Sequence, residues 1–294
     1  MILHSIPKSI KQKINRNPVP NNNIAEYKFV VFDLDGTLLT HDFQLLPSTS
    51  QAISEIRAAG FRVSVATGRS YKSAEPFCQQ LNIDEPMVFS NGAVVDNPDT
   101  GQRDVISGIP LKTVKTVLDL LPEFKLSLKV HLPSGDLYKT DNTPWPDEGV
   151  HFEVGEIRPN IARELTETPV KMVFYDPEDR VKLFEEKLDK KLGQDSHVRT
   201  FRSHTRYVEM TNIKTSKGDA VKMLMDKLGV NAQEVVAVGD QDNDFEMLRI
   251  FGFGVMAGPG TAKLRDVCDL QIPRPEDRGI EQLRDWLLGS QLSV

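Results

Sequence analysis

The clearest chemistry in this chain lies in two carboxylates that stand two residues apart. Asp33 and Asp35 belong to the segment DLDGT, which directly follows the apolar run FVVF. Carboxylates at the end of a buried strand lie where open α/β sheets bind their ligands. Asp33 is a candidate nucleophile toward phosphorus. Asp35 is a candidate general acid for the leaving oxygen and a general base for water. Read alone, Asp-Gly is also a common turn dipeptide.

Two further motifs place polar groups at the starts of predicted helices. In VATGR, the hydroxyl of Thr67 and the backbone N–H groups around Gly68 can cradle a phosphate. On its own Thr67 would be read as a helix N-cap, and Arg69 as a salt-bridge or surface residue. Lys217 opens another predicted helix and can offset the charge of Asp33 and of a phosphate. An isolated lysine is more often a solvated surface charge.

A fourth motif, GDQDND, follows another apolar run and opens a helix. Clustered carboxylates suit Mg²⁺, which prefers oxygen ligands and shares them with a substrate phosphate. Asp240 is the candidate ligand, Asp244 a nearby carboxylate that orients a metal-bound water, and Asn243 a donor to phosphate. A calcium loop would need Gly and Glu where Phe245 and Phe251 stand, so that alternative is rejected.

The elements that must position these groups follow a regular rhythm. Short apolar β-forming runs alternate with helical patterns from Tyr27 onward, and the alternation returns in the last third of the chain. Such alternation predicts an α/β fold, a doubly wound parallel sheet covered by helices. The expected strands are 29–32, 61–66, 87–89, 235–238, 253–256 and 270–272, and the expected helices are 52–59, 70–81, 217–228, 245–251 and 279–288.

The middle of the chain breaks this rhythm. Asn91-Gly92 between apolar residues is typical of a hairpin turn, and strand-like and helix-like runs then mix. We interpret residues 91–206 as an inserted α+β cap and residues 27–90 and 207–294 as the core. Residues 1–26, basic until Glu26, are expected to form a tail or linker.

Composition narrows the function further. A net charge of −6 argues against a nucleic-acid partner, and no apolar run reaches the roughly 20 residues of a membrane span. The two cysteines lie far apart, which argues against a disulfide scaffold or zinc site and fits a reducing compartment. We expect a cytoplasmic protein, with an organelle-targeting role of the basic N-terminus as the alternative. Oligomeric state is not predicted.

Together the four motifs resemble the haloacid dehalogenase-like (HAD) hydrolase superfamily, in its Cof-type phosphatase branch. DLDGT, VATGR, Lys217-Gly218 and GDQDND occur in the order and spacing of that branch, and the similarity runs from about residue 27 to the C-terminus. The resemblance implies a Rossmann-like core with a substrate-specificity cap. It implies Mg²⁺ bound by Asp33, the backbone carbonyl of Asp35, and Asp240, with phosphate contacts at Leu34 (backbone), Thr67, Gly68, Lys217 and Asn243, and the Asn91-Gly92 loop near substrate.

The expected activity is therefore magnesium-dependent hydrolysis of small phosphate monoesters, such as sugar phosphates, through a phosphorylated Asp33. Two alternatives stay open. A phosphomutase would share the aspartyl phosphate but need a bisphosphate activator, and a receiver-like module would hold a stable phospho-aspartate without turnover. One departure concerns Gly258-Pro259-Gly260, which stands where relatives carry a GVAMGNA-like run beside the site.

Overall fold

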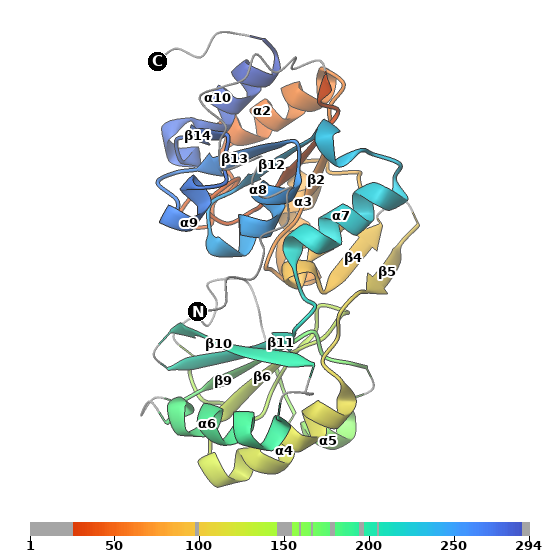
Figure 1. Cartoon of the computed structure of the whole chain (residues 1–294). Coiled ribbons are helices and arrows are strands. Elements are labelled where there is room, and N and C mark those ends of the chain that lie inside the picture. The colour runs from red at the N-terminus through yellow and green to blue at the C-terminus, as the bar shows by residue number, and fades with distance from the viewer. Residues whose placement is uncertain are drawn as a thin grey trace, which may run out of the picture.

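The computed structural model describes residues 26–97, 100–145, 155–158, 160–165, 167–176, 180–193, 197–204 and 206–289. Apart from Glu26, the expected N-terminal tail lies outside these residues. The described chain forms two α/β parts, one built from both ends of the sequence and one from its middle (Figure 1). None of the helices in these residues combines the length and apolar composition that a membrane span requires.

The first part contains a five-stranded sheet in which all neighbours are parallel. Its strand order is β14-β13-β12-β1-β2. The bounds are Phe29–Phe32 (β1), Arg62–Val65 (β2), Val235–Gly239 (β12), Phe253–Ala257 (β13) and Leu270–Ile272 (β14). The apolar runs therefore form the parallel strands that their composition predicts, buried on both faces.

Helices cover both faces of this sheet, so the doubly wound prediction is confirmed (Figure 1). In β1, Val30 and Phe32 face one helical layer while Phe29 and Val31 face the other, as the two-residue period of a strand requires. The first layer comprises Pro47–Ala58 (α2), Tyr71–Gln80 (α3) and Gly279–Leu287 (α10), and the second comprises Lys217–Lys227 (α7), Phe245–Ile250 (α8) and Ala262–Arg265 (α9).

The predicted hairpin at Asn91-Gly92 is also confirmed. Met87–Phe89 (β3) pairs antiparallel with Val94–Asn97 (β4), which pairs with Gln102–Val105 (β5). A single parallel bridge from Ala66 to Val88 joins this small sheet to the end of β2.

The second part is a six-stranded sheet with helices on one face (Figure 1). Its strand order is β10-β11-β9-β6-β7-β8. The strands are Ser127–His131 (β6), Leu137–Lys139 (β7), Glu156–Ile157 (β8), Lys171–Tyr175 (β9), Val198–His204 (β10) and Tyr207–Asn212 (β11). The helices are Leu111–Phe124 (α4), Ile161–Glu164 (α5) and Val181–Leu192 (α6).

The expected borders of the cap fall inside sheets. β11 begins at residue 207, yet it pairs with β10 and β9 of the second part, and residues 94–105 pair with β3 of the first. We therefore propose that the junctions lie near residues 107 and 215. There the hydroxyls of Ser107 and Thr215 lie 2.8 Å apart, and the Asn212 amide donates to the carbonyl of Gly108 at 2.7 Å.

Candidate active site

The first and fourth motifs meet at the carboxyl edge of the five-stranded sheet. β1 and β12 are adjacent, with Phe32 opposite Val238, and the backbone N–H of Asp33 donates to the carbonyl of Val238 at 2.9 Å. The next residue, Leu34, has its side chain buried in the core, so only its backbone can contact a ligand. Segments about 200 residues apart thus present their carboxylates at one point because their strands are neighbours.

Lys217 lies inside this site and not on the surface. Its Nζ donates to Oδ1 of Asp33 at 2.8 Å and to Oδ1 of Asp244 at 2.6 Å. The hydroxyl of Ser216 accepts from the backbone of Asp219 and caps α7, which fixes the start of the helix. Burial alone would lower the pKa of Lys217, but the charges of Asp244 and Asp33 outweigh it and raise that pKa. The lysine is therefore a fixed positive charge beside Asp33.

Asp244 is fully buried and shapes the loop of the fourth motif. Its Oδ2 accepts from the backbone N–H groups of Asp240 at 3.0 Å and Gln241 at 3.1 Å, while its Oδ1 binds Lys217. The carboxylate thus holds the position of Asp240 through the backbone and holds Lys217 through an ion pair. A charge-assisted bond to each of three donors makes this a rigid part of the site.

The carboxylates of Asp33, Asp240 and Asp244 form an acidic cluster with the composition of a metal site. One oxygen from each lies within 4.8 Å of the others, close to the roughly 3–4 Å between ligand oxygens of one magnesium ion. Oδ1 of Asp240 is buried and has no hydrogen-bond partner among the described residues. Because a buried carboxylate oxygen is costly to leave unpaired, the cluster fits a divalent cation.

Burial disfavours the ionised form of two of these carboxylates, Asp33 and Asp240. It raises the pKa of Asp33 well above the ordinary range, and Lys217 offsets only part of that effect. It also raises the pKa of Asp240 to about 7, with a further contribution from the charge of Asp244. A bound cation would favour both ionised forms, so the electrostatics and the geometry agree on the same ligand class.

Asp35 is near this cluster but not a member of it. Arg69 holds its carboxylate in a two-point contact, with Nη2 at 2.6 Å from Oδ1 and Nε at 2.9 Å from Oδ2. The guanidinium is buried and lies over the rings of Phe43 and Phe77. Of the two expectations for Arg69, the salt bridge is the one observed. Sequence alone did not indicate that its partner is Asp35.

Gly36 lets the chain turn beside the acidic cluster. Its φ is +75°, and a Cβ built there would lie 2.3 Å from Oδ2 of Asp240. Any side chain at this position would collide with Asp240, so the close approach of the loop after β1 requires glycine.

The second motif and the hairpin turn form a second wall. The backbone N–H of Asn91 donates to the carbonyl of Thr67 at 3.0 Å, and the Asn91 side chain lies against Gly68. Asn243 reaches across and donates to Oδ1 of Asn91 at 3.0 Å. Thr67 does not cap α3, because Ser70 accepts from the backbone of that helix. The amides and the exposed backbone therefore converge on one side of Lys217.

Gly92 joins this wall to α7. A Cβ there would lie 2.2 Å from the carbonyl oxygen of Ser216, and its φ is +100°. The close contact places the start of α7, and so Lys217, against the turn. The eleven site residues from the sequence thus lie on adjoining loops, short turns and a helix start. Arg69 holds the carboxylate of Asp35 outside the acidic cluster.

A cavity of about 630 Å³ extends from these residues to the second part of the molecule. On the core side Gly68, Lys217 and Asn243 line it. On the other side it is lined by residues that the sequence did not single out: Lys171, Arg199, Phe201, Glu209 and Thr211. These side chains belong to β9, β10 and β11, and none of the sequence motifs marked them.

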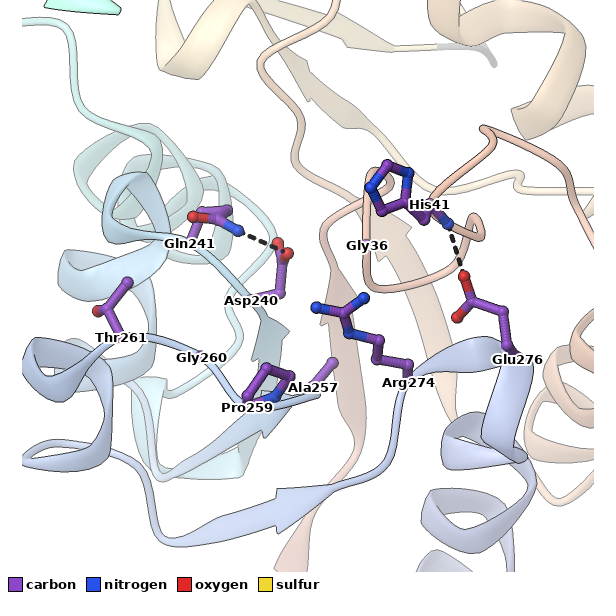
Figure 2. A pocket seen from close by; sticks show the side chains of 10 residues that line it. All are labelled: Gly36, His41, Asp240, Gln241, Ala257, Pro259, Gly260, Thr261, Arg274 and Glu276. Atoms are coloured by element: carbon purple, nitrogen blue, oxygen red, sulfur yellow. Dashed lines mark hydrogen bonds between the residues drawn. The ribbon is translucent and has the colours of Figure 1, made fainter.

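The Gly258-Pro259-Gly260 segment borders a second cavity of about 380 Å³ on the other side of Asp240. Figure 2 shows the Arg274 side chain projecting into it between Asp240 and His41, with Pro259 and Gly260 along its floor. The amide of Gln241 donates to Oδ2 of Asp240 there at 3.1 Å. The departure from the family pattern therefore lies beside Asp240 and away from the wall formed by Asn91 and Asn243.

Residues 30–283 match the family model of haloacid dehalogenase-like hydrolases. This chain belongs to that family. The match spans the four motifs and strands of all three sheets, which agrees with the resemblance of the motifs. The chain is thus a member of a hydrolase family, and curated relatives carry phosphatase names.

Among those relatives is a 5-amino-6-(5-phospho-D-ribitylamino)uracil phosphatase of Bacillus subtilis, 25% identical over 85% of this chain and 94% of its own. An HMP-PP phosphatase of Serratia proteamaculans is 29% identical over 91% of this chain and 98% of its own. The crystal structure of a haloacid dehalogenase-like hydrolase from Bacteroides thetaiotaomicron superposes with a TM-score of 0.82 at 19% identity, covering 89% of this chain and 99% of that one. The structural likeness establishes the fold.

Proposed function

We propose that this protein is a Mg²⁺-dependent phosphatase that hydrolyses small phosphate monoesters through a phosphorylated Asp33. The observation that carries the proposal is the convergence of Asp33, Asp240 and Asp244 within 4.8 Å, with Lys217 bonded to two of them. A carboxylate nucleophile is repelled by a phosphate dianion unless fixed positive charge offsets that repulsion. Lys217 supplies one such charge, and the acidic cluster can hold another.

Asp33, Asp240 and the backbone carbonyl of Asp35 would hold Mg²⁺, with Asp244 beside them. The unpaired Oδ1 of Asp240 supports this assignment. When bound, the ion neutralises negative charge on the transferring phosphoryl group. The specific choice of Mg²⁺ follows from an all-oxygen donor set with few protein ligands.

Two steps then belong to the chain itself. An oxygen of Asp33 attacks phosphorus, the bond from phosphorus to the leaving oxygen breaks, and Asp35 gives that oxygen a proton. Asp35 then takes a proton from water, which attacks phosphorus and returns Asp33 with release of inorganic phosphate. Arg69 positions Asp35 between these steps, since it holds both carboxylate oxygens.

The remaining polar groups bind the phosphoryl oxygens. Lys217 offers a buried ammonium, and Asn243 offers an amide already aligned by Asn91. Thr67, Gly68 and the backbone of Leu34 complete the cradle, because hydroxyl and N–H donors at loop ends bind phosphate without a charge of their own. These donors are fixed before substrate arrives, which favours catalysis.

Relatives named as phosphatases of 5-amino-6-(5-phospho-D-ribitylamino)uracil and of HMP-PP support a small phosphorylated metabolite as substrate. We test this with a phosphate-release screen over phosphorylated metabolites, with and without Mg²⁺. Release that needs no added bisphosphate argues for hydrolysis and against a mutase. Absence of release from every ester in the presence of Mg²⁺ would overturn the proposal.

The nucleophile is tested with Asp33→Asn, expected to abolish turnover. Asp42→Asn is the matched control, because Asp42 follows the same strand but is exposed. Asp35→Asn is expected to slow both formation and hydrolysis of the phosphoenzyme, as seen by rapid quench. Substantial activity in Asp33→Asn would remove the nucleophile assignment, and a phosphoenzyme that forms without turnover in the wild type would favour a receiver-like role.

A further inference from the structure

The open face of the six-stranded sheet carries an ordered set of polar and aromatic side chains. In the register of β10, β11 and β9, Arg199 lies opposite Thr211, which lies opposite Lys171. Two residues away on each strand, Phe201 lies opposite Glu209, so this pair is on the same face as Arg199 and Thr211. The intervening residues of β9 and β11 face α4 and α6 in the core of this part. The five side chains therefore share the face that α4 and α6 leave uncovered.

This face closes the cavity that begins at the proposed phosphate cradle. All five side chains line it together with Lys217 and Asn243. A phosphoryl group bound at Asp33 would direct the organic part of its ester into this cavity. The side chains of β9, β10 and β11 are thus placed to contact the leaving group and not the phosphoryl group.

The charges on this face are unevenly matched. Lys171 is paired with Glu209 at 3.0 Å. Arg199 instead donates to neutral oxygens, the carbonyl of Thr215 at 2.8 Å and the hydroxyl of Thr211 at 3.4 Å. Among the described residues no carboxylate lies within ion-pair distance of Arg199. A guanidinium has five N–H donors, so most of its donors stay available to a ligand.

The core side of the cavity carries carboxylates that are already engaged. Asp242 accepts from the hydroxyl of Thr261 at 2.6 Å, and Glu246 is paired with Arg249. Lys263 lies over the ring of Phe245, 4.4 Å from its centroid. Arg199 also lines this cavity. Two hydrogen bonds to neutral oxygens hold it in place, and among the described residues no carboxylate pairs with it.

Phe201 adds an apolar surface beside this cation. Its side chain is 38% exposed, although most large apolar residues of the second part are buried. An exposed aromatic ring next to a fixed arginine suits a carbon skeleton that ends in an anionic group.

We propose that Arg199 binds a second anionic group, a carboxylate or a phosphate, on the organic part of the substrate. Guanidinium groups bind both through paired, charge-assisted hydrogen bonds. The inference rests on the proposed phosphatase function and assigns its substrate class: phosphate monoesters whose leaving group is itself anionic.

The test uses substrate pairs that differ in one group. 3-Phosphoglycerate and glycerol 3-phosphate differ in a carboxylate, and fructose 1,6-bisphosphate and fructose 6-phosphate differ in a phosphate. kcat/KM is measured with Mg²⁺ for the wild type, Arg199→Gln, Arg199→Lys and Lys112→Gln. Lys112 is an exposed cation on α4, on the covered side of the sheet, and serves as the control. Thermal unfolding checks that each variant is folded.

Arg199→Gln is expected to lower the kcat/KM ratio of anionic to neutral partner by about tenfold or more, because a charge-assisted pair is lost. Arg199→Lys should retain part of the ratio, and Lys112→Gln all of it. If Arg199→Gln lowers this ratio for only one of the two substrate pairs, that pair identifies the bound group as a carboxylate or as a phosphate. An unchanged ratio in Arg199→Gln, or no wild-type preference while 4-nitrophenyl phosphate is hydrolysed, overturns the Arg199 proposal alone. No hydrolysis of any ester, 4-nitrophenyl phosphate included, overturns the proposed function.

Discussion

Replacing Asp240 by asparagine should stabilise the metal-free protein. The Asp240 carboxylate is mostly buried, one of its oxygens has no partner among the described residues, and Asp244 adds a second negative charge nearby. Asparagine has nearly the same shape and no charge. The substitution therefore removes an electrostatic cost while leaving the packing against Gly36 in place.

The size of the effect follows from the pKa. Burial, with help from Asp244, raises the pKa of Asp240 to about 7 from the ordinary value of 3.8. Each unit corresponds to about 1.4 kcal/mol, so ionised Asp240 opposes folding by up to about 4 kcal/mol. The raised pKa means that this cost is absent below about pH 4, grows as pH rises toward 7, and is complete above 7. The gain from asparagine has the same pH dependence.

Urea unfolding with EDTA at about pH 4.5 and about pH 8 measures this difference, with Asp42→Asn as an exposed control. We expect Asp240→Asn to raise the free energy of unfolding at the higher pH by roughly 2–4 kcal/mol, and by about 1 kcal/mol or less at the lower pH. Adding Mg²⁺ should stabilise the wild type but not Asp240→Asn, since binding to the native state alone raises stability.

Two outcomes would contradict this reasoning. Equal stability of wild type and Asp240→Asn at about pH 8 would show that the carboxylate has a compensating partner or is well solvated. Equal stabilisation of both by Mg²⁺ would show that the ion does not use Asp240, and the metal assignment under the proposed function would fall with it.

Two other predictions concern a pair of glycines and the two cysteines. Gly60→Ala should cost about 1–2 kcal/mol for its positive φ alone, because no atom lies near its Cβ position. Gly92→Ala should cost more and lower kcat, because its Cβ would strike the carbonyl of Ser216; equal costs in urea unfolding would refute the contact. Burial raises the pKa of Cys78 to about 12, so at about pH 8 only about one part in ten thousand is thiolate. Iodoacetamide should label half-buried Cys268 first in folded protein and both in urea, and equally fast labelling would contradict the burial of Cys78.

The parallel core was predictable because its signals are local. Four consecutive apolar residues such as Phe29–Phe32 bury both faces of a strand, and this needs no knowledge of the partner strand. The strand Leu270–Ile272 was predicted with its observed bounds. The hairpin at Asn91-Gly92 was predictable for the same reason. Asn-Gly readily adopts the positive φ angles of a tight turn, and both residues have positive φ here.

The cap was less predictable because its strands are covered on one side. Val198–His204 mixes apolar, cationic and hydroxyl side chains, and its identity as a strand comes from pairing with β11. The same pairing supports our proposal that the cap border lies beyond residue 207, since β11 pairs with β9 in the second sheet. Arg199 and Phe201 could not be recognised as cavity residues before that register was known.

The sequence by itself determined which groups are available: the carboxylates of Asp33 and Asp240, the amides, and the strand ends that carry them. Only the tertiary structure decided how their charges are matched. It buried Lys217 between Asp33 and Asp244 and paired Asp35 with Arg69. The physical reason is that strand composition is read locally, whereas the energy of a charge depends on its burial and on partners that are distant in sequence.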